Sequence, residues 1–527
     1  MQQQITLKLL PSEAASPAVI QHTAAQHLGL PPAAVTGYVI IKQSIDARGK
    51  QPWVLMTILA FANEPFHDRT IQKIQLPQVS NAKHRVIIIG AGPAGLFAAL
   101  QLIEQGIQPI LLERGKDVRS RRRDLALLNK QGIINPESNY CFGEGGAGTY
   151  SDGKLYTRST KRGNVERILN ILVQFGASEK ILYEAHPHIG TNKLPDIITA
   201  MREQIRDCGG LFLFEEKVTD LLLHNNTIIK GVTTANGNSF EADAVILATG
   251  HSARDIFELL HHKNIHIECK PFALGVRVEH PQSIIDSIQY HCPTRSEFLP
   301  PASYSLVQQV HERGVFSFCM CPGGIIAPAA TNHNELVVNG WSPSKRNNPF
   351  ANSGIVVAVE LKDVINFKKT ASPLSGMYFQ QEVEQKAFQY GGGRFVAPAQ
   401  RMADFTQRTV STSFPACSYL PGIAPAPLNE VLPPFVFGSL QQAFIAFGKK
   451  MKGYFTNEAV VVATESRTSS PVRIPRDPVT LQHPQIGNLY PCGEGAGYAG
   501  GIVSAAMDGE RVATQIILEL RNGKLGN

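Results

Sequence analysis

A stretch with three closely spaced glycines, Gly90-Ala-Gly92-Pro-Ala-Gly95, constrains the fold of this chain more than any other feature of its sequence. It follows an apolar segment typical of a buried strand, residues 84–89, and it opens an apolar run typical of a helix. A second strand-like segment, residues 109–113, ends at Glu113, roughly twenty residues after the glycines. This order of strand, glycine turn, helix and acid-ended strand predicts a βαβ unit that binds a dinucleotide.

Each glycine of this fingerprint has a physical task. Gly90 permits the tight turn, Gly92 lets the backbone approach a pyrophosphate, and Gly95 lets the helix pack closely against the strand. The free N–H groups at the start of the helix, from Ala94 onward and next to Pro93, lie where phosphates bind. We therefore expect all five residues in the cofactor site.

Glu113 narrows the choice of dinucleotide. Its carboxylate can accept hydrogen bonds from ribose hydroxyls and would repel a 2′-phosphate, which favours FAD or NAD over NADP. A second run, Gly143-Glu-Gly-Gly-Ala-Gly148, has the same glycine spacing but lacks an apolar strand before it. One complete fingerprint predicts one tightly held dinucleotide.

A second glycine-rich segment lies near the end of the chain and favours FAD. Leu489-Tyr-Pro-Cys-Gly493-Glu494-Gly-Ala-Gly-Tyr-Ala-Gly500-Gly501 precedes an expected helix from about Ile502. A short strand would place Glu494 beside the cofactor, and the helix N–H groups would face a flat ring. The positive end of that helix would stabilise negative charge on a reduced flavin. The alternative is an ordinary glycine loop that caps a helix.

The 527 residues exceed the usual size of a single core and predict several domains. We expect a small α+β domain over residues 1–77, the first part of the nucleotide-binding domain over 83–265, an inserted β-rich domain over 266–461, and the second part of the nucleotide-binding domain over 462–527. The predicted fold class is α/β.

Composition excludes several other classes. Hydrophobic residues at 43% and charged residues at 18% argue against a disordered chain, and the net charge of +7 is modest. The densest basic run, residues 119–124, has no interleaved aromatics, so nucleic-acid binding is disfavoured and a solvated helix face is the simpler interpretation. The uncharged run 86–103 is broken by glycines and Pro93, which argues against a membrane span.

The eight cysteines have no disulfide-framework spacing, and the first residues lack a signal-peptide pattern. We therefore expect a soluble, cytoplasmic protein. Cys319 and Cys321 form a Cys-x-Cys pair, which differs from the Cys-x-x-Cys of thiol redox motifs. Whether this pair is redox-active stays open, and the absence of a second cysteine pair at structural spacing predicts no metal site.

Several motifs spread over the chain point to one family. The chain resembles the glutathione-reductase-fold flavoproteins, and its finer motifs are similar to those of bacterial uncharacterised FAD-dependent dehydrogenases. The motifs that carry the resemblance are the two glycine segments, Glu113-Arg114, Ala248-Thr-Gly250, Ser44-Ile-Asp-Ala-Arg48, Phe142-Gly-Glu-Gly-Gly-Ala-Gly-Thr-Tyr-Ser-Asp-Gly-Lys154, His186-Pro-His-Ile-Gly-Thr191, Cys321-Pro-Gly-Gly324, Asn339-Gly-Trp-Ser342 and Glu465-Ser-Arg-Thr-Ser-Ser-Pro471.

The resemblance implies a Rossmann-like FAD-binding domain of the glutathione-reductase type and a non-covalent FAD. It does not supply a substrate. Taken with the glycine segments, it predicts FAD contacts at Gly90, Gly92, Pro93, Ala94, Gly95, Glu113, Arg114, Gly148, Thr149, Ser151, Asp152, Gly153, Val218, Ala248, Thr249, Gly250, Gly493, Glu494, Gly500, Gly501 and Ile502.

Candidate catalytic residues are those that could exchange a proton near the flavin or bind an anionic substrate. They are Lys154, His188 and Arg467, with His186 and Glu465 considered beside them. For His188 the alternative is a hydrogen-bonded loop histidine. For Arg467 the alternative is a structural salt bridge with a neighbouring domain.

The favoured function is an FAD-dependent oxidoreductase, a dehydrogenase or reductase that passes hydride between FAD and an unidentified small molecule. The electron donor or acceptor is unknown, and NAD(P)H is one candidate. Two alternatives stay open: a flavin reductase that uses NAD(P)H, and a non-catalytic flavin-dependent sensor or RNA-associated factor.

Overall fold

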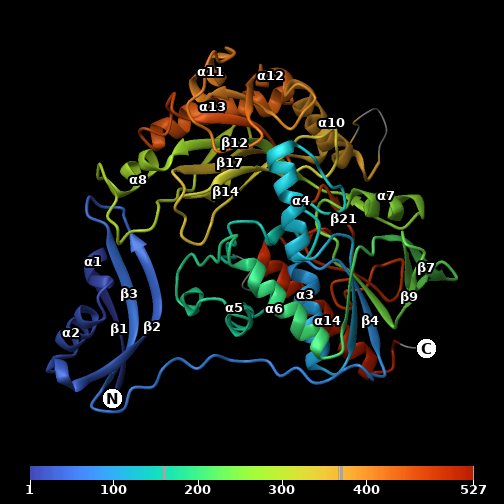
Figure 1. Cartoon of the computed structure of the whole chain (residues 1–527), viewed down its shortest axis with the longest axis horizontal. Coiled ribbons are helices and arrows are strands. Elements are labelled where there is room, and N and C mark those ends of the chain that lie inside the picture. The colour runs from blue at the N-terminus through green and yellow to red at the C-terminus, as the bar shows by residue number, and fades with distance from the viewer. Residues whose placement is uncertain (158–161, 366, 368–371, 526–527) are drawn as a thin grey trace.

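The computed structural model describes residues 1–157, 162–365, 367 and 372–525, so residues 526–527 of the predicted last segment lie outside the described residues. Figure 1 shows a small unit that contains the N-terminus, a unit built on β4, α3 and α14, and an upper layer that contains β12, β14 and β17. An extended segment connects the small unit to β4.

The small N-terminal unit is a three-stranded antiparallel sheet in the order β1-β3-β2 with helices on one face. Its elements are β1 (Gln2–Leu9), α1 (Pro11–Ala14), α2 (Pro17–Leu28), β2 (Val35–Asp46) and β3 (Trp53–Ala62). Alternate residues of β1 and β3 are buried against α2, as expected for a sheet covered on one side. Strands with helices on one face form an α+β unit, the class that the sequence predicts for this part of the chain.

A five-stranded parallel sheet forms the second unit, in the order β22-β10-β4-β5-β6. The strands are β4 (Arg85–Ile89), β5 (Gln108–Glu113), β6 (Leu211–Phe214), β10 (Ala244–Leu247) and β22 (Leu489–Pro491). The strand β22 lies about 240 residues after β10 yet pairs with it, because the chain returns to this sheet near its end.

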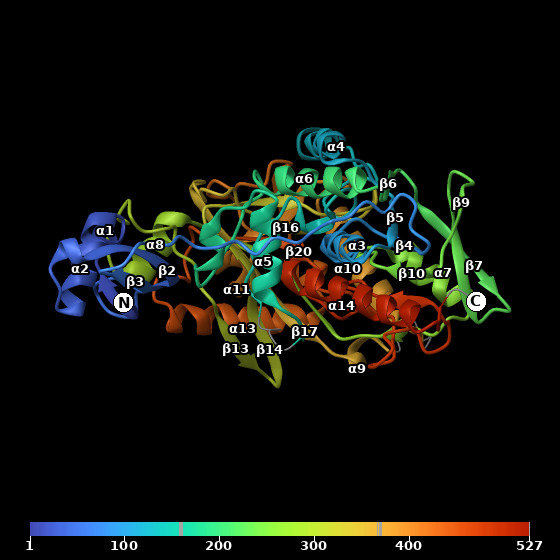
Figure 2. The ribbon, with the colours of Figure 1, turned by 90° about the horizontal axis from the view of Figure 1, so that it is seen from below.

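Both faces of this sheet are covered, which explains why its strands are continuous apolar runs rather than alternating ones. Val86 and Ile88 pack on the helix side with α3 (Pro93–Glu104) and α14 (Ile502–Arg521). Ile87 and Ile89 pack on the opposite side with the small sheet of β7 (Val218–His224), β8 (Ile228–Thr234) and β9 (Ser239–Glu241) and with α7 (Arg254–His262). Figures 1 and 2 both show α3 and α14 side by side.

The third unit is a seven-stranded sheet in the order β13-β14-β17-β12-β20-β18-β19, packed against long helices. Its elements include β12 (Phe272–Pro281), β13 (Val307–Val310), β14 (Arg313–Cys321), β17 (Phe350–Val359), β18 (Ala397–Arg401), β19 (Ile423–Pro425), β20 (Val460–Glu465), α10 (Ser375–Tyr390) and α13 (Pro434–Lys450). Helices therefore contribute as much to this unit as strands do, although the sequence pattern predicts only a β-rich insertion.

The predicted boundary between residues 461 and 462 falls inside β20. This strand pairs with β12 and β18 along its length, so the inserted unit extends at least to Glu465. The error arises because β20 is an apolar run that sequence alone assigns equally well to either sheet. Among the described residues, no helix has the length and apolar character needed to cross a membrane.

Candidate functional site

A cavity of about 350 Å³ lies where the parallel-sheet unit meets the seven-stranded unit. Two helices, α3 and α14, begin at this cavity, and no described side chain caps the first turn of either helix. Their first N–H groups therefore lack the intrahelical partners that later turns provide. Two positive helix ends at one cavity make a site for negatively charged groups.

The turn before α3 depends on two glycines. Gly90 has a φ of 106°, which side chains disfavour, and a Cβ there would lie 2.4 Å from the carbonyl oxygen of Ala248. A Cβ on Gly95 would lie 2.0 Å from the carbonyl oxygen of Gly90. Gly95 therefore lets the helix approach the turn and does not line the cavity, contrary to the prediction of direct cofactor contact.

The two glycine segments meet in space. A Cβ on Gly148 would lie 3.6 Å from Pro93 at the start of α3 and 3.2 Å from Ile502 at the start of α14. A Cβ on Gly493 would lie 3.0 Å from the Cβ of Ala94. The run around Gly148, which has fingerprint spacing but no strand before it, therefore forms part of the same site rather than a second dinucleotide site.

Three glycines leave room that a larger residue would fill. A Cβ on Gly92 would be 3.9 Å from its nearest neighbour, and no described atom comes within 4 Å of a Cβ on Gly500 or Gly501. All three residues line the cavity. Nearby, the buried hydroxyl of Thr249 has no hydrogen-bond partner among the described residues, which is rare for a buried polar atom unless a ligand binds there. These features fit a cofactor with a diphosphate and a flat ring.

Glu113 lies at the end of β5, at the cavity wall, and is nearly fully buried. One carboxylate oxygen accepts hydrogen bonds from the N–H groups of Gly115 and Gly143, and the other accepts one from Ala91, all at 2.9 Å. Three backbone donors fix the carboxylate in orientation and leave lone pairs for ribose hydroxyls.

Arg114 follows Glu113 and stacks on the ring of Phe142, with 4.2 Å between the guanidinium carbon and the ring centroid. Its N–H groups also bind Glu137 at 2.5 Å and Asp255 at 2.8 Å. Arg114 thus presents one edge of a fixed guanidinium to the cavity.

Most other predicted cofactor residues line the same cavity. They are Ser151, Asp152, Gly153, Val218, Ala248, Gly250, Glu494 and Ile502, besides those already described. Thr149 does not: it is fully buried, its hydroxyl donates to the carbonyl of Glu144, and Arg121 donates to it. The sequence places Thr149 in a predicted ligand-binding segment but does not indicate that its side chain points into the protein core, away from the cavity.

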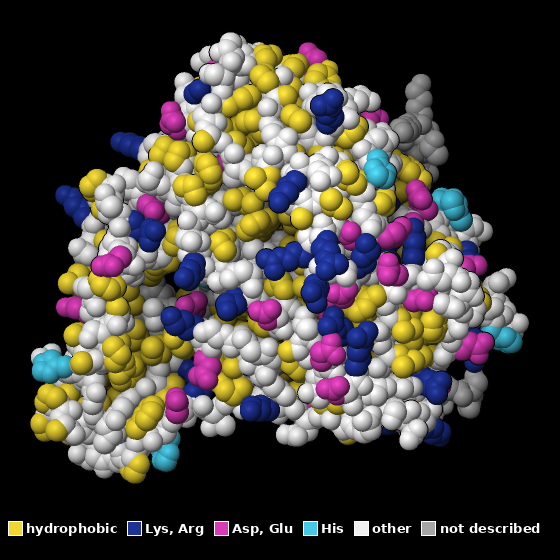
Figure 3. Space-filling model, in the orientation of Figure 1, with side chains coloured by type: hydrophobic (Ala, Val, Ile, Leu, Met, Phe, Trp, Pro, Cys, Tyr) yellow, Lys and Arg dark blue, Asp and Glu magenta, His cyan; other side chains and the backbone are white. Residues whose placement is uncertain are grey.

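Arg121 shows why the basic run is not simply a solvated helix face. The helix α4 (Val118–Gln131) carries this run, and Figure 3 shows Lys and Arg side chains gathered across the region that α4 covers in Figure 1. Arg121 itself is fully buried and donates to the carbonyls of Asn139, Tyr140 and Glu144. Arg121 thereby holds the segment that contains the glycine run 143–148 against α4.

Two of the three predicted catalytic residues lie at the cavity and one does not. Lys154 lines it, with its ammonium 3.7 Å from Asp152. His188 is not a lining residue; its Nε2 lies 3.1 Å from the carbonyl oxygen of Ser344, which is the loop-histidine alternative. Burial, together with the charge of Arg346, lowers the pKa of His188.

Arg467 lines the cavity, but its donors are largely used inside the protein. It binds both oxygens of Glu384 at 3.1 and 2.9 Å, Glu335 at 3.0 Å and the hydroxyl of Thr331 at 2.9 Å. The structure therefore favours the salt-bridge alternative, because a guanidinium held by two carboxylates has little positive charge left for a substrate.

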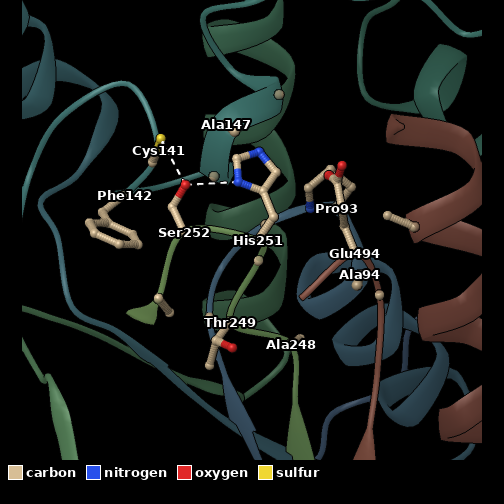
Figure 4. Close-up of a pocket in the computed structure, with 18 of the residues that line it drawn as sticks. Pro93, Ala94, Cys141, Phe142, Ala147, Ala248, Thr249, His251, Ser252 and Glu494 are labelled. Atoms are coloured by element: carbon tan, nitrogen blue, oxygen red, sulfur yellow. Dashed lines mark hydrogen bonds between the residues drawn. The ribbon is translucent and has the colours of Figure 1, made fainter. Parts of the chain in front are cut away.

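Sequence reasoning missed His251, which directly follows the Ala248-Thr-Gly250 motif at the carboxyl edge of the sheet. Figure 4 shows its Nδ1 at Ser252 Oγ, 2.8 Å away, while Ser252 donates to Cys141 Sγ at 3.3 Å. Because this hydroxyl donates to Cys141, Nδ1 carries the ring hydrogen and Nε2 is an acceptor. Burial, with Arg467 and Arg254 nearby, lowers the pKa of His251 to about 4, so the imidazole is neutral at physiological pH.

Glu494 approaches the start of α3 from the loop after β22, as Figure 4 shows. Burial raises its pKa to about 7, although Lys270 acts in the opposite direction. A carboxyl that titrates near neutral pH at a cofactor cavity is a candidate for proton transfer.

Family models match the chain over both units that surround the cavity. Residues 84–259 match the family described as pyridine nucleotide-disulphide oxidoreductase, and residues 271–468 match the family described as FAD-dependent protein, C-terminal domain-like. Residues 1–61 match a domain of unknown function. The two larger matches cover the units that form the cavity.

The chain is also distantly similar to solved structures. The tetracycline destructase Tet(51) is 12% identical with a TM-score of 0.34, covering 84% of this chain and 82% of that one. Glycine oxidase from Bacillus cereus ATCC 14579 is 15% identical with a TM-score of 0.29, covering 84% and 96%. Similarity this low carries no argument about function.

Curated proteins related to the chain in sequence include the following two. The tRNA uridine 5-carboxymethylaminomethyl modification enzyme MnmG of Alkaliphilus metalliredigens (strain QYMF) is 29% identical over 173 residues, 31% of this chain and 24% of that enzyme. An uncharacterized protein of Clostridium beijerinckii (strain ATCC 51743 / NCIMB 8052) is 40% identical over 496 residues, 91% of this chain and 92% of that protein. With the matched domains, this relationship confirms the predicted cofactor and general activity: the chain belongs to the same family as the Clostridium protein, a family of FAD-dependent oxidoreductases.

Proposed function

We propose that FAD binds without a covalent bond in the cavity between the two glycine segments and exchanges a hydride there with a small-molecule substrate. The observation that carries the proposal is the meeting of two uncapped helix N-termini at a cavity floored by Gly92 and Gly501. One terminus suits a diphosphate and the other suits a flavin edge that becomes negative on reduction.

Different residues would bind different parts of the cofactor. Gly92, Pro93 and Ala94 would bind the diphosphate, Glu113 the ribose, and the Gly500–Ile502 turn the flavin edge. Bound FAD supplies the hydride chemistry, while the chain supplies placement, charge and exclusion of water.

We assign the parallel-sheet unit to cofactor binding and the seven-stranded unit to covering the flavin. Phe318 and Cys319 on β14, and Asn339 on β16 (Val338–Trp341), line the same cavity as Gly92 although they come from the inserted unit. Sites formed between two units in this way are common for small-molecule substrates.

A second cavity of about 60 Å³ would hold the reacting end of the substrate. It shares Cys141, His251, Cys319, Asn339 and Arg467 with the cofactor cavity, so the two adjoin. Aromatic and apolar side chains form most of its remaining wall: Tyr140, Tyr150, Ala327, Pro328, Ala329, Val337, Val338 and Trp341. This lining favours a small, largely apolar reacting group.

Two side chains could handle the proton that accompanies hydride transfer. His251 presents a neutral acceptor at the junction of the cavities. Glu494, with its pKa near 7, can hold or release a proton on the side of α3. Both side chains line the cavity in which the cofactor would bind.

The test is to load the purified chain with FAD and expose it, without oxygen, to NADH, NADPH and a panel of small reduced molecules. We expect one FAD per chain and loss of visible flavin absorbance with a non-nicotinamide donor. Rapid reduction by NADPH alone would instead support the flavin-reductase alternative. Stable FAD binding with no reduction by any donor would support the sensor alternative.

A further inference from the structure

Cys319 and Cys321 lie at an irregularity in β14, at the wall of the cofactor cavity. The pairing of β14 with β17 shifts register between Phe318 and Cys321, and Cys319 has a φ of 47°. In a regular strand, residues two apart point to one face without touching. At this bulge the Cys321 thiol instead turns back toward Cys319 and donates to its backbone carbonyl oxygen at 3.2 Å.

The two cysteines differ in exposure. Cys319 lines both the cofactor cavity and the adjoining second cavity, whereas Cys321 is fully buried behind it. A ligand in either cavity can therefore meet Cys319 but not Cys321. An accessible sulfur with a resolving sulfur beside it is the arrangement that thiol–disulfide exchange requires.

Two cations hold the turn between the cysteines. Lys154 donates to the carbonyl of Met320, the residue between them. Arg277, fully buried, donates to the carbonyl of Cys319 at 2.7 Å and to Cys321 Sγ at 3.4 Å, and it pairs with Glu465 at 3.0 Å. The neighbouring Cys321 thiol, with Lys154 and Arg277, lowers the pKa of Cys319, whereas Cys319 and burial raise the pKa of Cys321. These surroundings favour a thiolate at Cys319 and a thiol at Cys321.

We propose that Cys319 and Cys321 form a redox-active pair that exchanges two electrons with FAD in the adjoining cavity. The proposal rests on the proposed function. In the oxidative direction, the Cys319 thiolate sulfur bonds to the sulfur of Cys321 and the S–H bond of Cys321 breaks. Its proton and the two electrons pass to oxidised flavin, which becomes the anionic reduced flavin, so charge and atoms balance. In the reverse direction, reduced flavin opens the disulfide.

The first test counts thiols in the full chain freed of FAD. The protein is equilibrated with oxidised or reduced dithiothreitol, quenched in acid, alkylated and analysed as peptides by mass. We expect all eight cysteines to be alkylated under reducing conditions, and two fewer under oxidising conditions, with 319 and 321 linked. The variants Cys319→Ser and Cys321→Ser should lose no pair of thiols on oxidation.

Cys141→Ser is the matched control, because Cys141 lines the same cavities but lies on another segment. This variant should still lose two thiols. Lys154→Met should raise the pKa of Cys319, so the pH at which its alkylation rate is half-maximal should move up by roughly one unit. Full alkylation of all eight cysteines in every redox buffer, or loss of the linkage in Cys141→Ser, would overturn the proposal.

The second test separates this proposal from the proposed function. FAD is added anaerobically to the reduced chain, and bound flavin, flavin absorbance and thiols are measured together. We expect absorbance to fall while two thiols disappear. FAD that binds with unchanged absorbance and eight remaining thiols overturns the redox pair and leaves the proposed function standing, whereas failure to bind FAD overturns the proposed function.

Discussion

Single carboxyl groups in this protein differ widely in how easily they ionise, and their neighbours explain the differences. Glu384 is fully buried, yet Arg254 and Arg467 hold its pKa at about 2 in spite of that burial. Glu494 is half-buried at the cavity, where burial raises its pKa to about 7 and the opposing charge of Lys270 offsets this only in part. The first carboxyl fixes structure, and the second is free to exchange a proton.

The raised pKa of Glu494 predicts a pH-dependent stability. Between pH 4.5 and 7 the folded chain keeps a proton on Glu494 that the unfolded chain releases, so the stability from this group falls as pH rises through that window. Glu494→Gln should remove on the order of 2 kcal/mol of that decline. Thermal unfolding of the FAD-free protein at pH 5 and pH 8 measures it. An identical pH dependence in the two proteins would show that Glu494 titrates normally.

At the scale of elements, a buried ion network joins four separate segments. Glu384 on α10 accepts hydrogen bonds from Arg254 at the start of α7 and from Arg467 after β20, and Ser466 donates to it at 2.7 Å. Glu335 binds both arginines as well. The network therefore holds the inserted unit against the cofactor-binding unit, beside the cavity.

Removing Glu384 should loosen this junction. Glu384→Ala would leave two buried guanidinium groups without their main partner, at a cost of about 3–5 kcal/mol in the free energy of unfolding. Glu382→Ala is the control on the same helix, because Glu382 is 40% exposed and pairs only with Lys386 four residues on among described partners. Its cost should stay below about 0.5 kcal/mol. Denaturant unfolding measures both; equal losses would contradict this role for the network.

At the scale of the whole molecule, the N-terminal unit stands apart from the cofactor site. It has its own core around Leu7, Met56 and Ile58, and every described residue that lines the cofactor cavity comes from Ile89 onward. Its strand β2 joins the rest through two backbone hydrogen bonds of Gln43, to Tyr183 and Ala185. Figure 1 shows this unit at one end of the molecule.

Deleting residues 1–62 should therefore leave cofactor binding intact. We expect the shortened chain to bind FAD with an affinity within about twofold of the full chain, since no cavity contact is lost. Fluorescence titration of FAD measures this. A large loss of affinity would show that the unit supports the cavity from a distance.

The parts of the fold that were predictable are those whose signals are local. A few neighbouring residues are enough to recognise the glycine turn at Gly90, the acid-ended strand at Glu113 and the C-terminal strand, loop and helix. The boundary inside β20, the burial of Arg121 and the ion pairs of Arg467 depend on partners distant in sequence. The hydrophobic pattern of the sequence does not indicate such distant partners. The charge of the two arginines therefore suggested a solvent-facing or a substrate-binding role.

The central claim is that FAD binds where the two glycine segments meet, and Gly92→Ala tests it most directly. A methyl group there meets no protein atom closer than 3.9 Å, so the fold should be unchanged, but it would occupy the space that a pyrophosphate needs. Gly438→Ala in α13 is the control, because its Cβ also meets no described atom within 4 Å and lies away from the cavity. In an FAD titration, we predict one tightly bound FAD in the wild type and in Gly438→Ala. Gly92→Ala should bind FAD at least tenfold more weakly, while its thermal stability equals that of the wild type. Equal affinity in all three proteins would contradict the account.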